Sequence, residues 1–357
     1  MADGRLSADK GVCSQLMQNI SPEKALHEVL SEKILTVYGA GARVESLKKL
    51  STGASRETWS FVVVTAKTMC VPLILKRDPV VYRANGTIAK EETGLGVERA
   101  VEGKLIELAE GAGVPVPGVS FYLSENEKTT SGFVMEHLQG ETLGRRILRE
   151  ESYAAARRRL AFQCGQAAAR LHGIALGDLP ELECRTAREQ LEQDHDTMNR
   201  FGHPYPGFEY GFRWLEERLE WAGEGLGLVH GDFRNGNIVV NADGLRGILD
   251  WELAHVGNPV SDLGWICVRS WRYGHVSKPV GGFGEISELL AGYKAGGGNP
   301  VSPEAIHYWE VFGTLRWGVL CIAMTFSHLH GTQTSLEKAV IGRRTAETEY
   351  DLLQLVN

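Results

Sequence analysis

Three polar side chains in the second half of the chain have types and spacings that suit phosphoryl transfer. Asp232 follows an apolar run, Asn237 comes five residues after it, and Asp250 ends a second apolar run thirteen residues beyond. Transfer of a phosphoryl group needs a carboxylate beside the attacking hydroxyl and oxygen ligands for Mg²⁺. The spacing therefore predicts that Asp232 orients and deprotonates a hydroxyl, while Asn237 and Asp250 hold the metal ion.

A β-hairpin is expected to bring the two metal-ligand candidates together. Residues 238–240 and 245–249 have strand character, and Asp243-Gly244 between them is a good turn signal. The alternative is a polar loop, a surface hairpin and an aspartate that caps the next helix. Any one of these residues alone would favour that alternative. All of them together, each beside an apolar strand, favour the chemical interpretation.

The elements before residue 140 predict a sheet with helices. A helix is expected from Ser21 to about Thr36, because a hydroxyl cap, a proline in the first turn and then an acid are typical of helix starts. The polar stretch 78–94, which contains Asn85-Gly86, predicts a loop. Strands are expected at 44–50, 58–65, 71–76, 119–123 and 133–135, and a second helix at 95–110.

The pattern changes after Gly140, where helical periodicity dominates. Helices are expected at 152–172 and 208–222, and most of the chain from Val260 onward has helical character. A domain boundary is therefore expected near residues 136–140.

The pattern His230-Gly231-Asp232, followed by Asn237 and Asp250, resembles the active site of the aminoglycoside phosphotransferases and the related choline and homoserine kinases. The resemblance implies that Asp232 is the catalytic base, that Asn237 and Asp250 bind Mg²⁺, and that His230 holds the loop. It also implies ATP as the phosphoryl donor.

The same resemblance implies a bilobal α+β fold like that of protein kinases. The N-terminal lobe, 1–137, would hold an antiparallel sheet, a helix and the nucleotide-binding loop. The C-terminal lobe, 138–357, would be mainly helical and hold the catalytic loop, the metal site and the acceptor pocket. Arg234 stands where protein kinases often place a lysine near the transferred phosphate, so it is a second catalytic candidate.

Residues upstream match the nucleotide-binding elements of the family in the same order. The resemblance implies that a loop of small residues between the first two strands approaches the phosphates. It implies that a lysine at a strand end holds the α- and β-phosphates, and that backbone near residue 136 binds adenine. A hairpin turn and a solvated strand edge are the local alternatives. The residues assigned in this way are Ser51, Gly53, Ser55, Arg56, Thr58, Lys76, Met135, Glu136 and Leu138.

An acid on the following helix is expected to pair with Lys76. Glu102 is preferred, because it aligns with the family's glutamate when the segment 113–117 serves as the anchor. Glu98 lies one turn earlier on the same face and is the alternative. A solvated helix face would explain both acids equally simply.

Two further residues match structural positions of the family. Asp262 is expected to hydrogen-bond the backbone of the catalytic loop, with a plain helix cap as the local alternative. His172 is expected to be a hydrogen-bonded core histidine rather than a catalyst. The segments 262–274 and 342–353 resemble a bacterial branch related to the kinase domains fused to acyl-CoA dehydrogenases.

The resemblance implies an ATP-dependent kinase that phosphorylates a hydroxyl of a small molecule. A protein kinase is less favoured, because only eleven residues separate Asp250 from Asp262 and no Ala-Pro-Glu closes an activation segment. A non-catalytic nucleotide-binding sensor is the other alternative. Such proteins usually lose the base or a metal ligand, whereas Asp232, Asn237, Asp250 and Lys76 are all in this sequence.

The acceptor is left open between three classes. The fused relatives suggest a hydroxyacyl-CoA or similar hydroxy acid, and an amino alcohol or an aminoglycoside is the alternative. Seven of the eight tryptophans lie beyond residue 200, where they can form a cage for a quaternary ammonium or, more commonly, pack between helices. Four arginines are candidates for an anionic group, with surface solvation as the alternative: Arg269, Arg272, Arg343 and Arg344.

Composition narrows the partners. The net charge of -7 and the pI of about 5.9 disfavour a general nucleic-acid binder, which would be basic. The six cysteines are scattered without a C-x-x-C pair, so a reducing cytoplasm is the simpler expectation. Neither a signal peptide nor a membrane span is apparent. The oligomeric state is not readable from the sequence.

Overall fold

The structure is a computed structural model that describes residues 22–357 apart from 51–55, 83–87, 91–95, 127–128 and 332–334. The chain folds into two compact units. The smaller unit falls within 1–95 and 118–137, and the larger unit holds 96–117 and 138–357.

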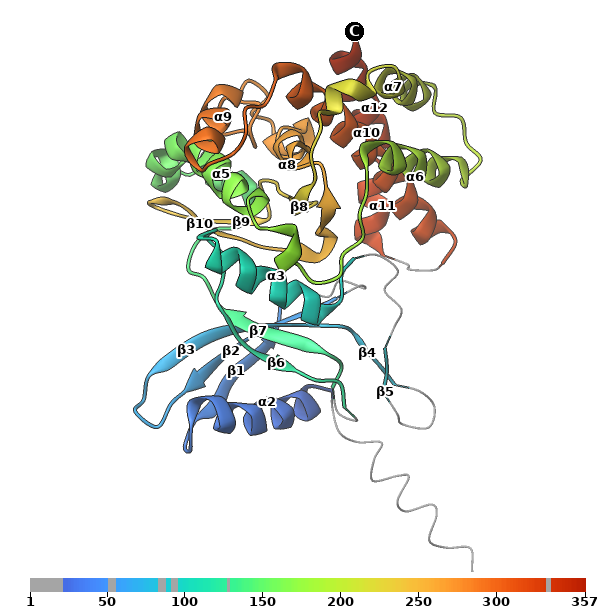
Figure 1. Cartoon of the computed structure of the whole chain (residues 1–357). Coiled ribbons are helices and arrows are strands. Elements are labelled where there is room, and N and C mark those ends of the chain that lie inside the picture. The colour runs from blue at the N-terminus through green and yellow to red at the C-terminus, as the bar shows by residue number, and fades with distance from the viewer. Residues whose placement is uncertain (1–21, 51–55, 83–87, 91–95, 127–128, 332–334) are drawn as a thin grey trace, which may run out of the picture. The chain divides into compact units, whose positions relative to one another are not determined.

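A five-stranded antiparallel sheet is the body of the smaller unit (Figure 1). Every second residue of its second strand is buried, including Trp59, Phe61 and Val63, which is the pattern of a strand with one covered face. Helix α2 (Pro22–Tyr38) covers that face with Leu26, Leu30 and other apolar residues. The strand order is β1 (Arg43–Lys49), β2 (Glu57–Val64), β3 (Cys70–Arg77), β7 (Gly132–Glu136) and β6 (Val119–Leu123).

The stretch 78–94 differs from expectation. Instead of a continuous loop it contains a short antiparallel pair, β4 (Val80–Tyr82) and β5 (Ile88–Lys90). Strand β4, Val-Val-Tyr, is rich in residue types that favour extended backbone, whereas β5 contains only one such residue, Ile88. Each strand is only three residues long, so polar residues dominate the stretch and no strand pattern stands out in the sequence.

The larger unit is mainly helical (Figure 1). The short strands β8 (Gly227–Val229) and β11 (His255–Gly257) pair with each other, and β9 (Ile238–Asn241) and β10 (Gly244–Ile248) form the expected hairpin. The α+β class, with an antiparallel sheet and a mainly helical second part, is therefore confirmed. The helices are α3 (Arg99–Gly111), α4 (Gly144–Arg149), α5 (Ala154–His172), α6 (Ala187–Asn199), α7 (Pro206–Glu216), α8 (Val260–Trp265), α9 (Ile286–Ala295), α10 (Pro303–Leu329), α11 (Leu336–Gly342) and α12 (Thr345–Val356).

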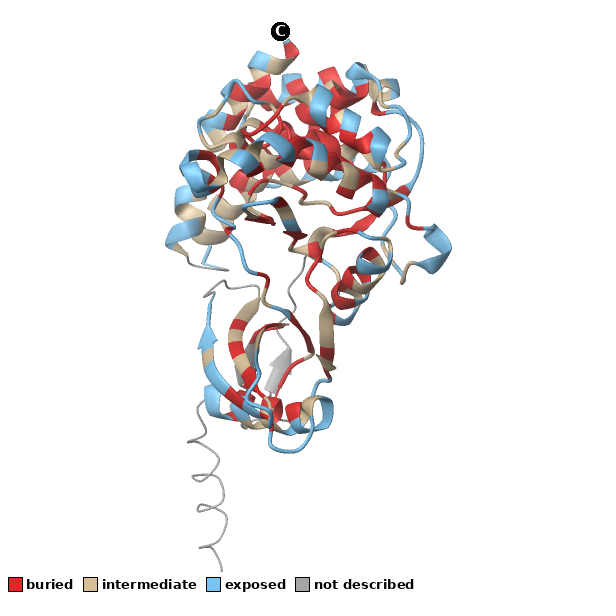
Figure 2. Cartoon of the chain, turned by 90° about the vertical axis from the view of Figure 1, so that its left-hand side faces the viewer, coloured by how far each residue is buried: buried red, intermediate tan, exposed pale blue. Residues whose placement is uncertain are grey.

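Helix α10 is the centre of the larger unit's core. It begins where the Ser302 hydroxyl accepts the Ala305 N–H at 3.1 Å, with Pro303 in the first turn. Its buried residues pack against α6, α7 and α12 in one apolar cluster that includes Trp309, Phe312 and Leu315. Buried residues accordingly concentrate in the interior of the helical part, and exposed residues lie at its outside (Figure 2).

Helices α5 and α9 cross at close range because each carries a glycine at the contact. A Cβ atom on Gly165 would overlap the Leu289 carbonyl, and one on Gly292 would overlap the Phe162 carbonyl. The two backbones therefore touch directly, and α5 also packs against strand β10 of the hairpin that carries the metal-ligand candidates.

Helix α3 groups with the larger unit, whereas the sequence placed it in an N-terminal lobe of residues 1–137. It begins at Arg99, four residues later than expected. The division of nucleotide-binding and acceptor-binding roles at residue 137 stays a prediction. Among the helices of the described chain, none is long and apolar enough to cross a lipid bilayer.

Candidate active site

The carboxylate of Asp232 is held on both of its oxygens. Oδ1 accepts hydrogen bonds from Nε of Arg234 at 2.9 Å and from the indole N–H of Trp265 at 2.8 Å. Oδ2 accepts from the side-chain amide of Asn237 at 2.5 Å. A carboxylate oxygen has two lone pairs. Oδ1 therefore has both occupied, and Oδ2 keeps one for a further donor.

The surroundings of Asp232 set its acidity. Burial raises the pKa of its carboxyl, and the charge of Asp250 acts in the same direction. Arg234 and Trp265 lower the pKa, but burial outweighs them. The group is therefore a stronger base than an exposed aspartate, while its hydrogen bonds favour the ionised form.

His230 holds the start of this loop rather than facing a substrate. Its Nδ1 accepts the Asp232 backbone N–H at 3.2 Å, so the ring proton resides on Nε2, which donates to the Leu249 carbonyl at 3.0 Å. Burial lowers the pKa of His230 although Asp262 and Asp232 raise it, which keeps the ring neutral. The expected loop-holding contacts of His230 are confirmed.

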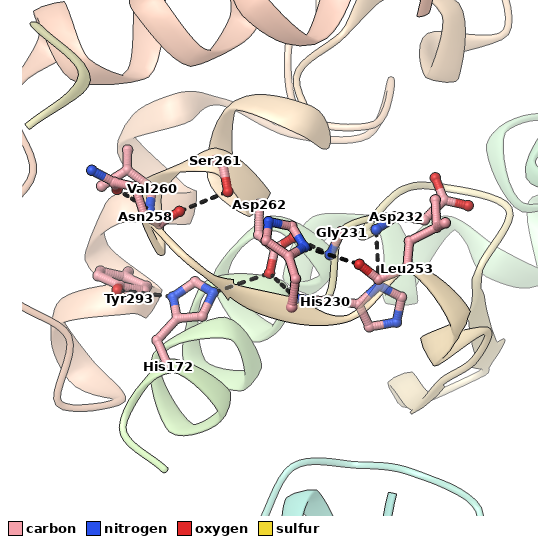
Figure 3. A network of polar contacts seen from close by, with 11 residues as sticks. His172, His230, Gly231, Asp232, Leu253, Asn258, Val260, Ser261, Asp262 and Tyr293 are labelled. Carbon is pink, nitrogen blue, oxygen red and sulfur yellow. Dashed lines mark hydrogen bonds and ion pairs between the residues drawn. The ribbon is translucent and has the colours of Figure 1, made fainter. Parts of the chain in front are cut away.

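Asp262, on α8, hydrogen-bonds the backbone of the same loop just before Asp232 (Figure 3). Its carboxylate accepts the backbone N–H groups of His230 at 2.8 Å and Gly231 at 3.0 Å. It also accepts from Nε2 of His172 at 3.1 Å, and Nδ1 of that ring lies 3.0 Å from the Tyr293 hydroxyl. Both expectations are confirmed: Asp262 hydrogen-bonds the catalytic loop, and His172 is a satisfied core histidine.

Gly231 is required where it stands. Its backbone has φ of 80°, and a Cβ would collide with the Leu253 carbonyl. A residue with a side chain would be strained in this conformation and would also clash. The glycine thus lets the loop turn tightly just before Asp232.

The hairpin brings Asn237 beside Asp250. The backbone N–H of Leu249 donates to the Asn237 carbonyl at 2.8 Å, so the residue that follows Leu249 lies next to Asn237. Because the Asn237 amide nitrogen is bonded to Asp232, its side-chain oxygen is the atom that remains for a cation. The donor set of one amide oxygen and the Asp250 carboxylate consists of hard oxygens and fits Mg²⁺.

Asp250 itself has unusual backbone geometry. Its φ of 67° and ψ of 64° lie in the left-handed region, which is uncommon for a residue with a side chain. The next residue, Trp251, is fully buried and donates its indole N–H to the Ile248 carbonyl at 3.2 Å. The buried indole and the left-handed turn together set where the Asp250 carboxylate leaves the backbone.

The nucleotide-binding candidates divide between the two units. Ser51, Gly53 and Ser55 lie outside the described residues. Arg56 precedes β2, and Thr58 and Lys76 are direct cross-strand partners in β2 and β3. Met135 and Glu136 end β7, opposite Ile74 and Leu73 of β3. These residues therefore share one sheet of the smaller unit.

Glu102 and Leu138 belong to the larger unit. Glu102 is fully buried and forms an ion pair with Arg99, a partner that the sequence did not indicate. Leu138 packs where a Cβ on Gly247 would fall. The choice between Glu102 and Glu98 as the partner of Lys76 stays a prediction, because these acids and Lys76 lie in different units.

Two indoles that were not assigned to the site from the sequence complete it together with Arg234. Trp265 donates to Asp232, and its ring packs against Trp271 at 5.4 Å between centroids. The Arg234 guanidinium lies 4.7 Å from the centre of the Trp271 ring. Trp265 comes one helical turn after Asp262, so the shared helix face was the signal that could have linked both to the loop.

The family follows from a comparison with known proteins. Residues 46–298 match the model of the phosphotransferase enzyme family. The chain belongs to this family. The structure has the protein-kinase-like fold that the sequence predicted.

The curated relatives that this phosphotransferase matches are much longer proteins. It is 30% identical over 168 residues to acyl-CoA dehydrogenase family member 11 of Gallus gallus, covering 43% of this chain and 21% of the relative. The Homo sapiens protein of the same name is 30% identical over 164 residues, covering 42% and 20%. The chain thus spans about a fifth of the length of these relatives.

Solved structures share the fold at low identity. A putative aminoglycoside phosphotransferase from Ralstonia eutropha has a TM-score of 0.66 at 17% identity, covering 92% of this chain and 97% of that one. A spectinomycin phosphotransferase in complex with ADP and spectinomycin has a TM-score of 0.62 at 13%, covering 92% and 98%. A choline/ethanolamine kinase family protein from Mesorhizobium loti has a TM-score of 0.57 at 17%, covering 92% and 98%.

Proposed function

We propose that this phosphotransferase moves the γ-phosphate of ATP to a hydroxyl of a small molecule, with Asp232 as the base and Mg²⁺ held by Asn237 and Asp250. One observation carries the proposal. Three donors orient the Asp232 carboxylate and occupy three of its four lone-pair positions, next to a pair of oxygen ligands that suits Mg²⁺. This arrangement leaves one defined position on Oδ2.

In this mechanism the acceptor hydroxyl donates its hydrogen bond to Oδ2 of Asp232. The hydroxyl oxygen attacks the γ-phosphorus, a new P–O bond forms, and the bond from the γ-phosphorus to the bridging oxygen breaks to release ADP. The proton of the hydroxyl passes to Oδ2. The raised pKa of Asp232, caused mainly by burial, makes this transfer easier.

Arg234 has two roles in the proposal. Its Nε fixes Oδ1 of Asp232 at 2.9 Å, and its guanidinium is seated on the Trp271 ring. A guanidinium held in this way keeps further N–H donors for the oxygens of the transferred phosphate. Mg²⁺, when bound, neutralises phosphate charge.

The nucleotide is proposed to lie against the sheet of the smaller unit. Thr58 and Lys76 are adjacent on β2 and β3, which suits contact with the phosphates. The Glu136 N–H already donates to the Gly118 carbonyl at 2.9 Å, so adenine would meet the carbonyl of Glu136 and the N–H of Leu138. Arg56, Met135, Glu102 and the loop with Ser51, Gly53 and Ser55 complete the assignment. A cytoplasmic location remains part of the proposal.

An aromatic cage for a quaternary ammonium gains no support from the tryptophans. Arg234 lies on the Trp271 ring, Arg344 lies 6.0 Å from the Trp317 ring centre, and Arg218 lies 4.6 Å from that of Trp214. At these three rings the chain's own cations therefore occupy a face that a cationic ligand would need. This weighs against choline-like acceptors within the amino alcohols.

The test is ADP release in the presence of ATP and Mg²⁺ over a panel of hydroxyacyl-CoAs, hydroxy acids, amino alcohols, sugars and aminoglycosides. The Asp232→Asn variant gives the background. Acceptor-dependent ADP release by the wild type, at least a hundredfold above that variant, is expected. Tight ATP binding without release of ADP on any acceptor would favour a nucleotide sensor instead, and phosphorylation of a generic peptide would favour a protein kinase.

A further inference from the structure

A small cavity of about 30 Å³ lies against the catalytic loop within the larger unit. Gly231, which precedes Asp232, and Trp265, which donates to Asp232, both line it. A cavity of this size holds about two water-sized groups. It is therefore large enough for a small polar group and lies directly beside the residues that hold Asp232.

Arg316 of α10 lines this cavity with a largely unused guanidinium. One of its nitrogens, Nη1, donates to the side-chain oxygen of Gln190 at 2.7 Å. Among the described residues, no carboxylate lies within ion-pair distance of Arg316. A guanidinium has five N–H donors in a planar fork that matches a carboxylate. Most of these donors are therefore available to a ligand.

His255 shows that the cavity is built for a polar occupant. The residue is only 4% exposed and lines the cavity. Its Nδ1 lies 2.9 Å from the Leu253 carbonyl, so Nδ1 carries the proton and Nε2 is a bare acceptor. Nε2 is buried and has no hydrogen-bond partner among the described residues. A buried acceptor of this kind requires a donor from a ligand or a bound water.

The cavity lining holds one cation, Arg316, and one carboxylate, Asp262, whose oxygens accept three donors from the loop backbone and His172. Arg185 is paired with Glu183 at 2.5 Å. Burial raises the pKa of Asp194, more than Arg316 and Arg185 lower it, so this carboxyl is pushed toward its neutral form. Burial, with Arg316 and Arg185 adding to it, lowers the pKa of His255 to about 4, which leaves that ring neutral. Arg316 is therefore the charged group of the lining with the most hydrogen-bonding capacity left for a ligand.

We propose that this cavity binds a terminal carboxylate of the phosphate acceptor through Arg316, with a ligand hydroxyl or a bound water donating to His255. The acceptor is then a hydroxylated acid rather than an amino alcohol, because an ammonium group would face Arg316. This inference rests on the proposed kinase function only in that the bound ligand is taken to be the phosphate acceptor. The anion site itself is defined by Arg316, Gln190 and His255.

The experiment uses the full chain and three matched ligand series. Straight-chain ω-hydroxy carboxylates are compared with diols and amino alcohols of the same chain lengths. Binding is measured by the change in tryptophan fluorescence, since Trp265 and Trp309 line the cavity, and turnover is measured by ADP release. We expect the best carboxylate to bind about 10- to 100-fold more tightly than its diol, and the amino alcohol to bind most weakly.

Three variants make the result specific. Arg316→Gln should remove the preference for the carboxylate, Arg316→Lys should keep part of it, and Arg188→Gln, at an exposed arginine of α6, should leave it unchanged. Melting temperatures check that the variants fold. If Arg316→Gln is unstable, the reduced carboxylate preference of Arg316→Lys still tests the role of Arg316.

The outcomes separate the two proposals. Equal binding of carboxylate and diol, no binding of any series, or an unchanged preference in Arg316→Gln means that the cavity holds only water, whether or not ADP is released. A carboxylate preference that depends on Arg316, seen by fluorescence without ADP release, would keep the anion site and overturn the kinase proposal.

Discussion

The indole N–H of Trp265 donates to Oδ1 of Asp232 at 2.8 Å, the same oxygen that Arg234 contacts at 2.9 Å. Two donors on one oxygen fix the rotation of the carboxylate, so its remaining lone pair on Oδ2 has one direction. Trp265 is anchored in turn by α8, which also carries Asp262. The helix that holds the loop backbone therefore also aims the proposed base.

Replacing Asp232 by asparagine should remove the base and keep the shape of the loop. Turnover should fall by about 10² to 10⁴-fold while the Kd for ATP stays within a few-fold of the wild type. Steady-state ADP release and direct ATP titration measure the two effects. Asp243→Asn, at the exposed tip of the hairpin, is the control and should behave like wild type. A nearly normal kcat in Asp232→Asn would exclude this residue as the base.

Trp265→Phe should keep the apolar packing and lose the hydrogen bond to Asp232. A hydrogen bond to a charged group contributes about 1.5–3 kcal/mol, so we expect kcat to fall about 10- to 100-fold with little change in the KM for ATP. Trp317→Phe is the matched control. Its indole belongs to the same aromatic cluster, but its N–H has no hydrogen-bond partner among the described residues. Equal losses in both variants would point to packing rather than to positioning of Asp232.

Asn237→Ala should raise the Mg²⁺ concentration needed for half-maximal activity. Even residues behind a metal ligand typically change metal affinity by 10- to 100-fold, so a direct ligand should reach at least about tenfold. The maximal rate should also fall, because the amide holds Oδ2 of Asp232 at 2.5 Å. Activity titrated with Mg²⁺ at saturating ATP separates the two effects. An unchanged titration midpoint would remove Asn237 from the metal site.

The left-handed backbone of Asp250 allows a comparison of two variants that both lack the carboxylate. Asp250→Gly and Asp250→Ala should be equally inactive. Alanine is strained at φ of 67°, whereas glycine is not, so the glycine variant should be more stable by about 1 kcal/mol. Urea unfolding of the two proteins measures this difference. If the alanine variant proves the more stable of the two, the backbone is not strained at Asp250.

Asp262 should make stability dependent on pH in the acidic range. Burial raises the pKa of Asp262. The hydrogen bond and charge of His172, together with the contacts to His230, lower it by more, so the pKa in the folded protein lies below the ordinary 3.8. The ionised group therefore stabilises the fold above about pH 4, and this contribution is lost as the pH falls further. Asp262→Asn should cost about 3 kcal/mol or more at pH 7.

The pH profile of that loss is the decisive measurement. Urea unfolding should show that the difference in free energy of unfolding between wild type and Asp262→Asn becomes smaller between pH 4 and pH 3. Asp178→Asn, at an exposed aspartate, should have the same free energy of unfolding as the wild type at every pH. A difference that widens on acidification would mean that the folded pKa of Asp262 is raised rather than lowered.

The parts of the site that sequence reasoning found are joined by local chain geometry. Asp232 and Asn237 share one loop, and a tight hairpin returns the chain to Asp250, so their spacing already implied their proximity. The loop-holding role of Asp262 was also predictable, because the family motif places it a fixed distance downstream. The expected strands mostly differ from the observed ones by one or two residues at their ends.

The parts that were missed depend on contacts between distant segments. Trp265 was one of seven late tryptophans, and nothing local indicates which indole faces the Asp232 loop. Arg316 reaches its cavity from the middle of α10, where its neighbours are core residues. The three-residue strands β4 and β5 are too short to show a period. In each case tertiary packing, rather than local propensity, decides the outcome.

The hydrogen bonds from the His230 and Gly231 amides to Asp262 also allow motion of the loop to be measured at two positions. Both N–H groups are bonded to a carboxylate on a helix about thirty residues away. They can exchange with deuterium only when α8 and the loop separate, so their exchange should be among the slowest in the larger unit. A ligand that loosens the loop during turnover would be recognised by faster labelling at these two positions alone.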